Sequence, residues 1–127
     1  MTTITKSAKK TIERKSLNRP EETRTFEKGK VELATIGGIT FGRATFQPGW
    51  KWSDHVKPVA KTKSCQAPHT QYVISGRLAV VMEDGTKVEF NPGDVGTIPP
   101  GHDAWVVGNE PVIAIDVTGM TDYARPA

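Results

Sequence analysis

Turn-forming residues divide the chain after about residue 25 into short apolar segments, and this spacing is the strongest constraint on its fold. The turn signals include Gly37-Gly38, Asp84-Gly85 and the run at 91–94, Asn-Pro-Gly-Asp. Such signals at intervals of about 8–12 residues are typical of a β-sandwich or a small β-barrel. No segment after residue 25 shows sustained helical periodicity. We therefore expect an all-β domain.

The segments between these turns have the length and composition of strands. Leu78, Val80 and Met82, for example, alternate with neighbours that are also largely apolar, which predicts a buried strand. Strands are expected at 31–36, 39–46, 71–74, 78–82, 86–90, 95–98, 104–107 and 112–117. The polar, basic stretch 56–64 is expected to be a loop at the rim of a site, and 11–17 a short helix or an arm that packs on a neighbouring subunit.

The whole-chain totals limit the class of protein. At 127 residues the chain forms one domain, with a basic arm at 1–24, partly disordered or exchanged in a dimer, and a barrel at 25–127. The first fifteen residues hold five basic residues and one acidic residue, so the rest is close to neutral and nucleic acid is not an expected partner. The chain shows no signal sequence, no apolar run long enough to cross a membrane and no second cysteine. We therefore expect a cytoplasmic protein without a membrane partner.

Side chains of the metal-ligand type gather in two short segments. The stretch 48–76 contains two of the three histidines and the single cysteine, and 99–105 contains the third histidine. The residues in these segments that we expect to build one site are His55, Cys65, His69 and His102, with Trp50, Trp52 and Trp105. A small chain that concentrates these residue types is expected to bind a small molecule there.

The same segments resemble the two sequence motifs of the cupin superfamily. PGWKWSDH, continued by HTQYVISG, resembles motif one, and FNPGDVGTIPPGHDAW resembles motif two. The chain is also similar to small bacterial cupins that carry WS-[DE]-HVKP and PPGHDAWVVG. The resemblance implies a single-domain double-stranded β-helix, or jelly-roll barrel, a divalent metal held by three histidines and one glutamate, and a homodimer.

The departures from those motifs lie at the ligand positions. Lys57 stands where the family has its second histidine, and His69 stands where it has glutamate. An insertion that contains Cys65 separates the two. In motif two the ligand position is Ala104, and His102 precedes it by two residues, on the same face of a strand.

One hypothesis is a metal site formed by His55, His69 and His102, with Cys65 as a further ligand. Imidazole and thiolate suit a divalent transition metal such as Zn, Fe, Ni, Mn, Co or Cu. With an open coordination position, such a site would serve an oxygenase, an isomerase or a lyase that acts on a small molecule.

Two alternatives remain open from the sequence. The protein could be a non-catalytic ligand-binding or sensor module without a metal, in which Lys57 binds an anionic ligand. It could also be a metal-free enzyme that uses a histidine as general acid or base. The residues expected to bind the small molecule are Lys57, Gln71, Tyr72, Trp50, Trp52 and Trp105.

Overall fold

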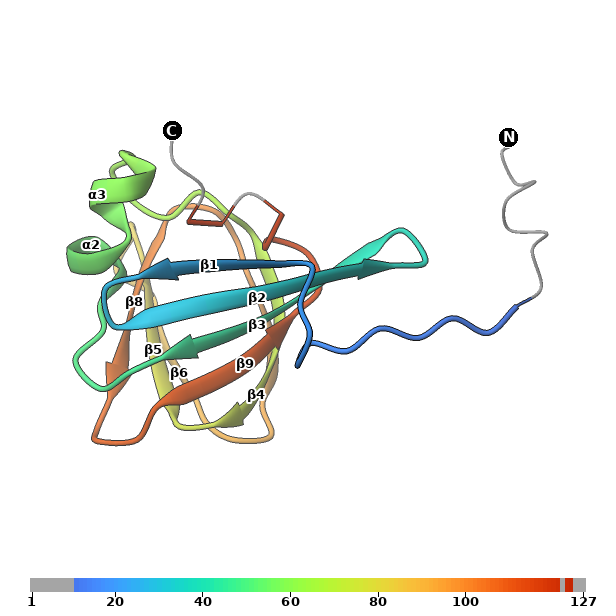
Figure 1. Ribbon diagram of the computed structural model, residues 1–127. Helices are drawn as coiled ribbons and strands as arrows, with labels where there is room; N and C mark the ends of the chain where they lie inside the picture. Colours follow the sequence, from blue (N-terminus) through green and yellow to red (C-terminus); the bar gives the residue numbers. More distant parts are fainter. Residues whose placement is uncertain (1–10, 122, 125–127) are drawn as a thin grey trace.

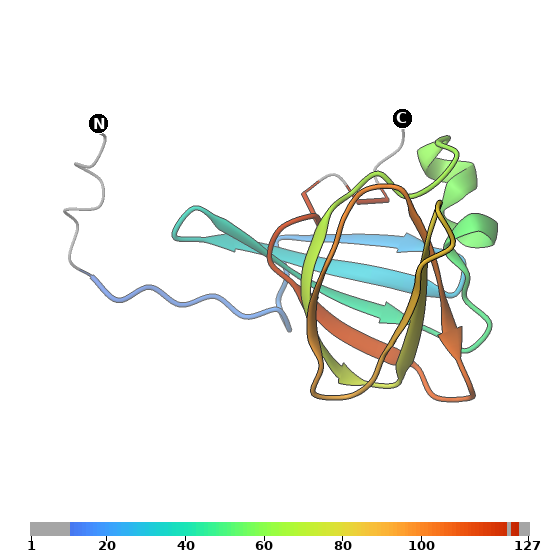
Figure 2. The ribbon, with the colours of Figure 1, turned by 180° about the vertical axis from the view of Figure 1, so that it is seen from behind.

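Two antiparallel sheets enclose a common interior in the computed structural model, which describes residues 11–121 and 123–124 (Figures 1 and 2). The six-stranded sheet has the order β1 (Glu22–Phe26), β2 (Gly29–Ile36), β3 (Ile39–Phe46), β9 (Val112–Asp116), β4 (His69–Ser75), β7 (Val95–Ile98). The three-stranded sheet has the order β6 (Lys87–Phe90), β5 (Arg77–Met82), β8 (His102–Val107). The all-β prediction is confirmed.

Alternate side chains of the central strands point into the space between the sheets. Each of β4, β8 and β9 alternates buried with more exposed residues, as expected for strands with one face on the core. The buried positions are His69, Gln71 and Val73 on β4, His102, Ala104 and Val106 on β8, and Val112, Ala114 and Asp116 on β9. His102 therefore shares its face with Ala104, as the sequence predicted.

Two short helices, which the sequence analysis did not predict, form just before and within the expected loop 56–64. These are α2 (Trp52–His55) and α3 (Lys57–Ala60), which lie together at one end of the barrel (Figure 1). Trp52 and Val56 are both buried, as residues four apart are when one face of a helix packs on the core. The backbone N–H of Ser53 donates to Asp103 Oδ1 at 3.1 Å and so ties α2 to β8.

Of the two structures expected for 11–17, the short helix does not form, and the arm on a neighbouring subunit stays a prediction. Residues 11–16 form no helix, and they extend away from the barrel with their side chains exposed (Figure 1). This segment has no apolar face to bury, which explains why a short helix gains nothing by forming. β1 begins at Glu22, inside the expected arm. Three of the seven basic residues of the arm, Lys6, Lys9 and Lys10, lie outside the described residues.

The described helices are all too short and polar to cross a bilayer.

Candidate functional site

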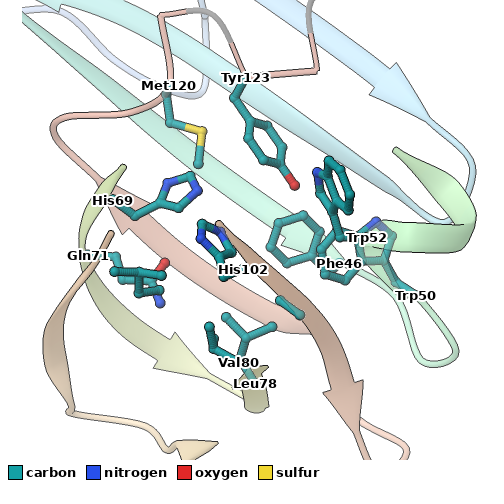
Figure 3. Close-up of a pocket in the computed structure, with 12 residues that line it drawn as sticks. Phe46, Trp50, Trp52, His69, Gln71, Leu78, Val80, His102, Met120 and Tyr123 are labelled. Atoms are coloured by element: carbon teal, nitrogen blue, oxygen red, sulfur yellow. The ribbon is translucent and has the colours of Figure 1, made fainter. Parts of the chain in front are cut away.

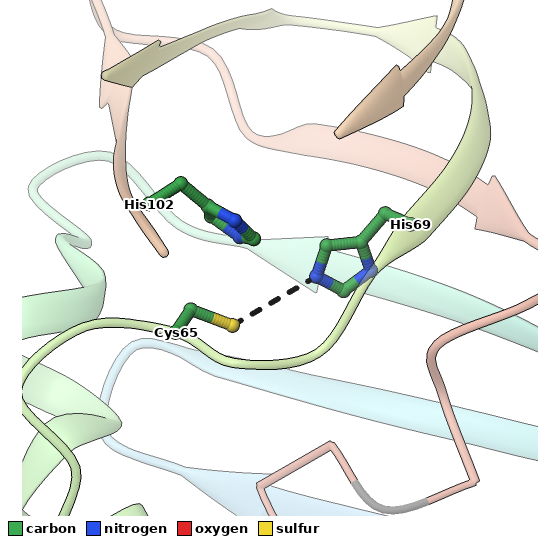
Figure 4. A group of neighbouring side chains, drawn as sticks. All are labelled: Cys65, His69 and His102. Carbon is green, nitrogen blue, oxygen red and sulfur yellow. Dashed lines mark hydrogen bonds between the residues drawn. The ribbon is translucent and has the colours of Figure 1, made fainter. Parts of the chain in front are cut away.

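Cys65, His69 and His102 bring their side chains together between the two sheets (Figure 4). One ligand-type atom from each residue lies within 4.8 Å of the other two. The three side chains come from the loop after α3, from β4 and from β8. All three residues are buried. Buried, convergent nitrogen and sulfur donors are the usual components of a transition-metal site.

Backbone pairing explains why Cys65 and His102 are neighbours. The N–H of Cys65 donates to the carbonyl of His102 at 2.8 Å, and the N–H of Gly101 donates to the carbonyl of Cys65 at 2.7 Å. This isolated antiparallel bridge places the two side chains opposite each other. Gly101 has φ +96°, a conformation that favours glycine, and it allows the chain to turn into β8 at this point.

Asp116 fixes the orientation and tautomer of His69. The Nδ1–H of His69 donates to Asp116 Oδ2 at 2.5 Å. The unprotonated Nε2 then faces Cys65 Sγ at 3.9 Å (Figure 4). A carboxylate behind a histidine is a common way to orient a metal ligand and increase its basicity.

A backbone carbonyl has the same effect on His102. The Nδ1–H of His102 donates to the carbonyl of Pro99 at 2.8 Å, which leaves Nε2 without a proton. Burial lowers the pKa of His102, with a smaller contribution from His69, so the neutral imidazole predominates near pH 7. In both histidines the Nε2 lone pair is therefore available to coordinate a metal ion.

Asp116 is fully buried but well supplied with hydrogen bonds. Its Oδ1 accepts from the backbone N–H groups of Thr118 at 2.8 Å and of Gly119 at 3.1 Å. Burial opposes the charged form, but the hydrogen bonds from His69 and from these two amides outweigh it and lower the pKa of the carboxyl. Asp116 thus remains a carboxylate.

Cys65 is a thiol, not a thiolate, when no cation is near. Burial, with the negative charges of Asp103 and Asp116, raises the pKa of the Cys65 thiol to about 11. A bound metal ion would replace this proton, because metal coordination favours the thiolate.

The two histidines open onto a pocket inside the barrel (Figure 3). Its empty volume of about 360 Å³ includes open solvent at the mouth, and the enclosed part is narrow, with room for about one water molecule between the side chains. Its walls are mainly aromatic and aliphatic, and Phe46 and Trp50 stack at a centroid distance of 3.9 Å. The lining residues are Phe46, Trp50, Trp52, His69, Gln71, Leu78, Val80, Ile98, His102, Ala104, Met120 and Tyr123.

The structure does not bring every predicted site residue to this pocket. His55, expected in one site with His69, lies at the end of α2, where its Nδ1 contacts the backbone of Lys51. Its Nε2 faces Glu27 at 4.0 Å, so it is not part of the cluster. Its place at the end of this helix, next to Lys51, keeps the side chain away from β4 and β8.

Three of the expected substrate-binding residues lie outside the pocket lining. Lys57 is exposed at the start of α3, so it does not replace a buried histidine. Tyr72 points outward from β4 and is 47% exposed. Trp105 lies on the outer face of β8, between the ammonium groups of Lys51 and Lys87. Trp50, Trp52 and Gln71 do line the pocket.

The sequence prediction missed Asp116, Met120 and Tyr123. Asp116 had a signal, because it follows Val112 and Ala114 at the next inward position of an alternating strand. Met120 and Tyr123 belong to a segment without strand or helix pattern after β9, so only the folded chain shows that they reach the pocket (Figure 3).

Comparison with known proteins agrees with this fold. The model of the EutQ-like cupin domain matches residues 55–115. The chain belongs to the cupin superfamily. None of the curated proteins matches it.

Several solved structures share the fold. An oxalate decarboxylase from Lactobacillus farciminis, in a formate complex, is 23% identical with a TM-score of 0.55, and the match covers 84% of this chain and 31% of that one. An oxalate decarboxylase from Bacillus subtilis is 26% identical with a TM-score of 0.53, over 81% and 29% of the two chains. A Rhizobium leguminosarum protein of unknown function is 20% identical with a TM-score of 0.56, over 86% and 97%. The chain thus spans about a third of the decarboxylases.

Proposed function

We propose that Cys65, His69 and His102 hold one divalent transition metal at the inner end of the pocket, where the protein acts on a small molecule. The observation that carries this proposal is the orientation of the two imidazoles. Each has its Nδ1–H engaged, by Asp116 or by the Pro99 carbonyl, which leaves Nε2 free. Nε2 of His69 faces the thiol at 3.9 Å, and a ring nitrogen of His102 lies within 4.8 Å of both. This is the arrangement that metal-binding histidines require.

The separation of Cys65 and His69 is close to that of two ligands of one tetrahedral ion. A sulfur and a nitrogen ligand at ordinary zinc distances lie about 3.6 Å apart at a tetrahedral angle. The observed separation of Cys65 Sγ and His69 Nε2 is 3.9 Å, and the ligand atom of His102 lies within 4.8 Å of both, so the three side chains would close in on a bound ion. Three protein ligands would leave a fourth position for water or substrate.

The charges also fit a dication. Two nearby negative charges stabilise a doubly charged ion in a buried site. The Cys65 thiolate and the Asp116 carboxylate supply them, and the two imidazoles remain neutral. The mixed nitrogen and sulfur donors favour Zn²⁺, Co²⁺, Ni²⁺ or Cu over the harder Mn²⁺.

The second candidate is a metal-free thiol enzyme. In it Cys65 would be the nucleophile, His69 the base and Asp116 the carboxylate that orients the base. Burial weakens this alternative, because a thiol with a pKa of about 11 is a poor nucleophile at neutral pH. His102 would also have no role in it. We therefore rank the metal centre first.

The chain's own residues would bind and orient the substrate. The aromatic and aliphatic walls exclude water from the inner pocket. The Tyr123 hydroxyl is directed toward the pocket (Figure 3), and burial raises its pKa well above the usual value, so it can act as a neutral hydrogen-bond donor. A bound ion would supply Lewis-acid activation of a carbonyl, as isomerases and lyases use, or oxygenase chemistry if it is redox-active.

Cobalt substitution tests the ligand set directly. Metal-free protein titrated with Co²⁺ should develop a cobalt–thiolate charge-transfer band and the intense visible absorption of a four-coordinate ion. Cys65→Ser should lose the charge-transfer band, whereas the matched change Ser64→Ala should keep it. A wild-type spectrum without thiolate absorption would rule out this site.

We also propose that two copies of the chain associate. Tyr72, Ile74 and Val95 are 47%, 46% and 74% exposed on neighbouring strands of the six-stranded sheet. Exposed apolar side chains that adjoin on a flat sheet face favour a protein interface.

A further inference from the structure

The pocket contains two buried hydrogen-bond donors that have no partner among the described residues. They are Trp50 Nε1 and Gln71 Nε2. Both residues line the pocket, and they are only 2% and 7% exposed. Buried polar groups are nearly always hydrogen-bonded, and an unpaired donor costs free energy unless a water molecule or a ligand pairs with it. An indole N–H and an amide NH₂ both require an acceptor atom.

No lining residue of the pocket is a lysine or an arginine. The only lysine expected in the site, Lys57, lies exposed on α3. The proposed metal ion would already be neutralised by Cys65 and Asp116. A negatively charged ligand would therefore bring an uncompensated charge into an apolar cavity, which is costly.

We infer that the ligand of this pocket is an uncharged small molecule with an apolar body and acceptor oxygens of the carbonyl type. Trp50 and Gln71 donate to those oxygens, and the aromatic walls contact the carbon skeleton. This inference names the substrate class of the proposed site. It rests on the proposed function in one respect, namely that the charge of the bound metal ion is already neutralised. The absence of a cationic side chain from the pocket lining holds whether or not an ion is bound.

Two compounds of the same shape separate a neutral from an anionic ligand. The ketone 3-methyl-2-butanone and the carboxylate isobutyrate differ by a methyl group in place of a charged oxygen. Each compound is titrated at neutral pH into metal-loaded protein and into metal-free protein. Binding is monitored through the NMR signals of the indole N–H groups and of the backbone amides. We expect the ketone to bind at least about tenfold more tightly and to shift the Trp50 indole signal. Equal or tighter binding of isobutyrate, or no ketone binding up to its solubility limit, would overturn the inference.

Removing one donor tests the assignment of the contacts. Gln71→Met keeps the length of the side chain but removes the amide, and should weaken ketone binding roughly three- to tenfold. Gln47→Met, on an exposed turn, is the matched control and should leave binding unchanged. Trp50→Phe should weaken binding by a similar factor, with the backbone spectrum confirming the fold.

The metal content of every sample is measured in parallel. Protein that binds metal but prefers isobutyrate would contradict the neutral-ligand inference and leave the metal centre intact. Protein that binds no metal but prefers the ketone would contradict the proposed function alone. Unchanged ketone affinity in both donor variants would show that Trp50 and Gln71 are not the recognition groups.

Discussion

Asp116 determines which nitrogen of His69 is free. Asp116→Asn keeps the shape of the side chain, but the amide NH₂ in the place of Oδ2 cannot accept from His69 Nδ1–H. The imidazole should then change to the Nε2–H tautomer and lose its metal-binding lone pair. We expect Zn²⁺ affinity to fall about 10- to 100-fold, measured by chelator competition, with the tautomer read from the nitrogen chemical shifts of the ring.

The control for this change is Asp54→Asn, on the exposed side of α2, which should leave Zn²⁺ affinity as it is. An unchanged affinity in Asp116→Asn, with the Nδ1–H tautomer retained, would show that the carboxylate does not orient His69 for a metal.

The Cys65 thiol makes metal binding depend on pH. Because burial raises its pKa to about 11, the thiol is protonated over the range from pH 7 to 9 in metal-free protein. The thiolate is the ligand, so binding releases one proton and affinity rises with pH. We expect an increase of about tenfold per pH unit, measured by chelator competition at several pH values. A pH-independent affinity would mean that Cys65 is not bound to the ion.

At the scale of single residues, the sequence identified three side chains that the fold brings together and misplaced a fourth. His69, His102 and Cys65 were named from their types and from the two motifs, and they do converge. His55 was named by the same argument, but its direction depends on a helical turn. The roles of Asp116 and Tyr123 depend on contacts between distant parts of the chain, which no local pattern encodes.

At the scale of elements, the turn after β9 holds the site together. Gly119 has no side chain, and a Cβ there would collide with the Pro68 carbonyl and approach His69 Nδ1 to 3.1 Å. Gly119→Ala should therefore displace β4 or the turn, lowering the free energy of unfolding by about 1–3 kcal/mol and weakening metal binding. Urea unfolding and metal titration measure both effects.

Thr121→Ala, an exposed position on the same turn, serves as the comparison and should behave like wild type. If Gly119→Ala has the same free energy of unfolding and the same metal affinity as wild type, the close approach of this turn to His69 has no consequence for the site.

The strands were predictable because their alternation and their turn residues are local signals. Eight of them were expected near their observed positions, among them β3 and β5. α2 and α3 were not expected, because each has only four residues and no sustained periodicity. β1 was missed because most of its residues are exposed and polar, and pairing with β2 defines it.

At the scale of the whole molecule, the exposed apolar face on β4 and β7 predicts association. Ile74→Lys would place a charge on this face, once on each subunit of a symmetric dimer. We expect wild type to behave as a dimer in light scattering after gel filtration, and the variant to shift toward the monomer. Val88→Lys, on exposed β6, is the matched control. A monomeric wild type would contradict the dimer proposal. The cytoplasmic location expected from the sequence stays a prediction.

The metal content of purified protein tests the central claim most directly. Wild type prepared without a histidine tag or chelator, then incubated with Zn²⁺ and dialysed, should carry about one ion per chain. His55→Ala should carry the same amount, because that side chain lies outside the cluster. Cys65→Ala, His69→Ala and His102→Ala should each lose most of it. A wild type that remains metal-free with Zn²⁺, Co²⁺, Ni²⁺ and Cu²⁺, or a loss confined to His55→Ala, would contradict the account.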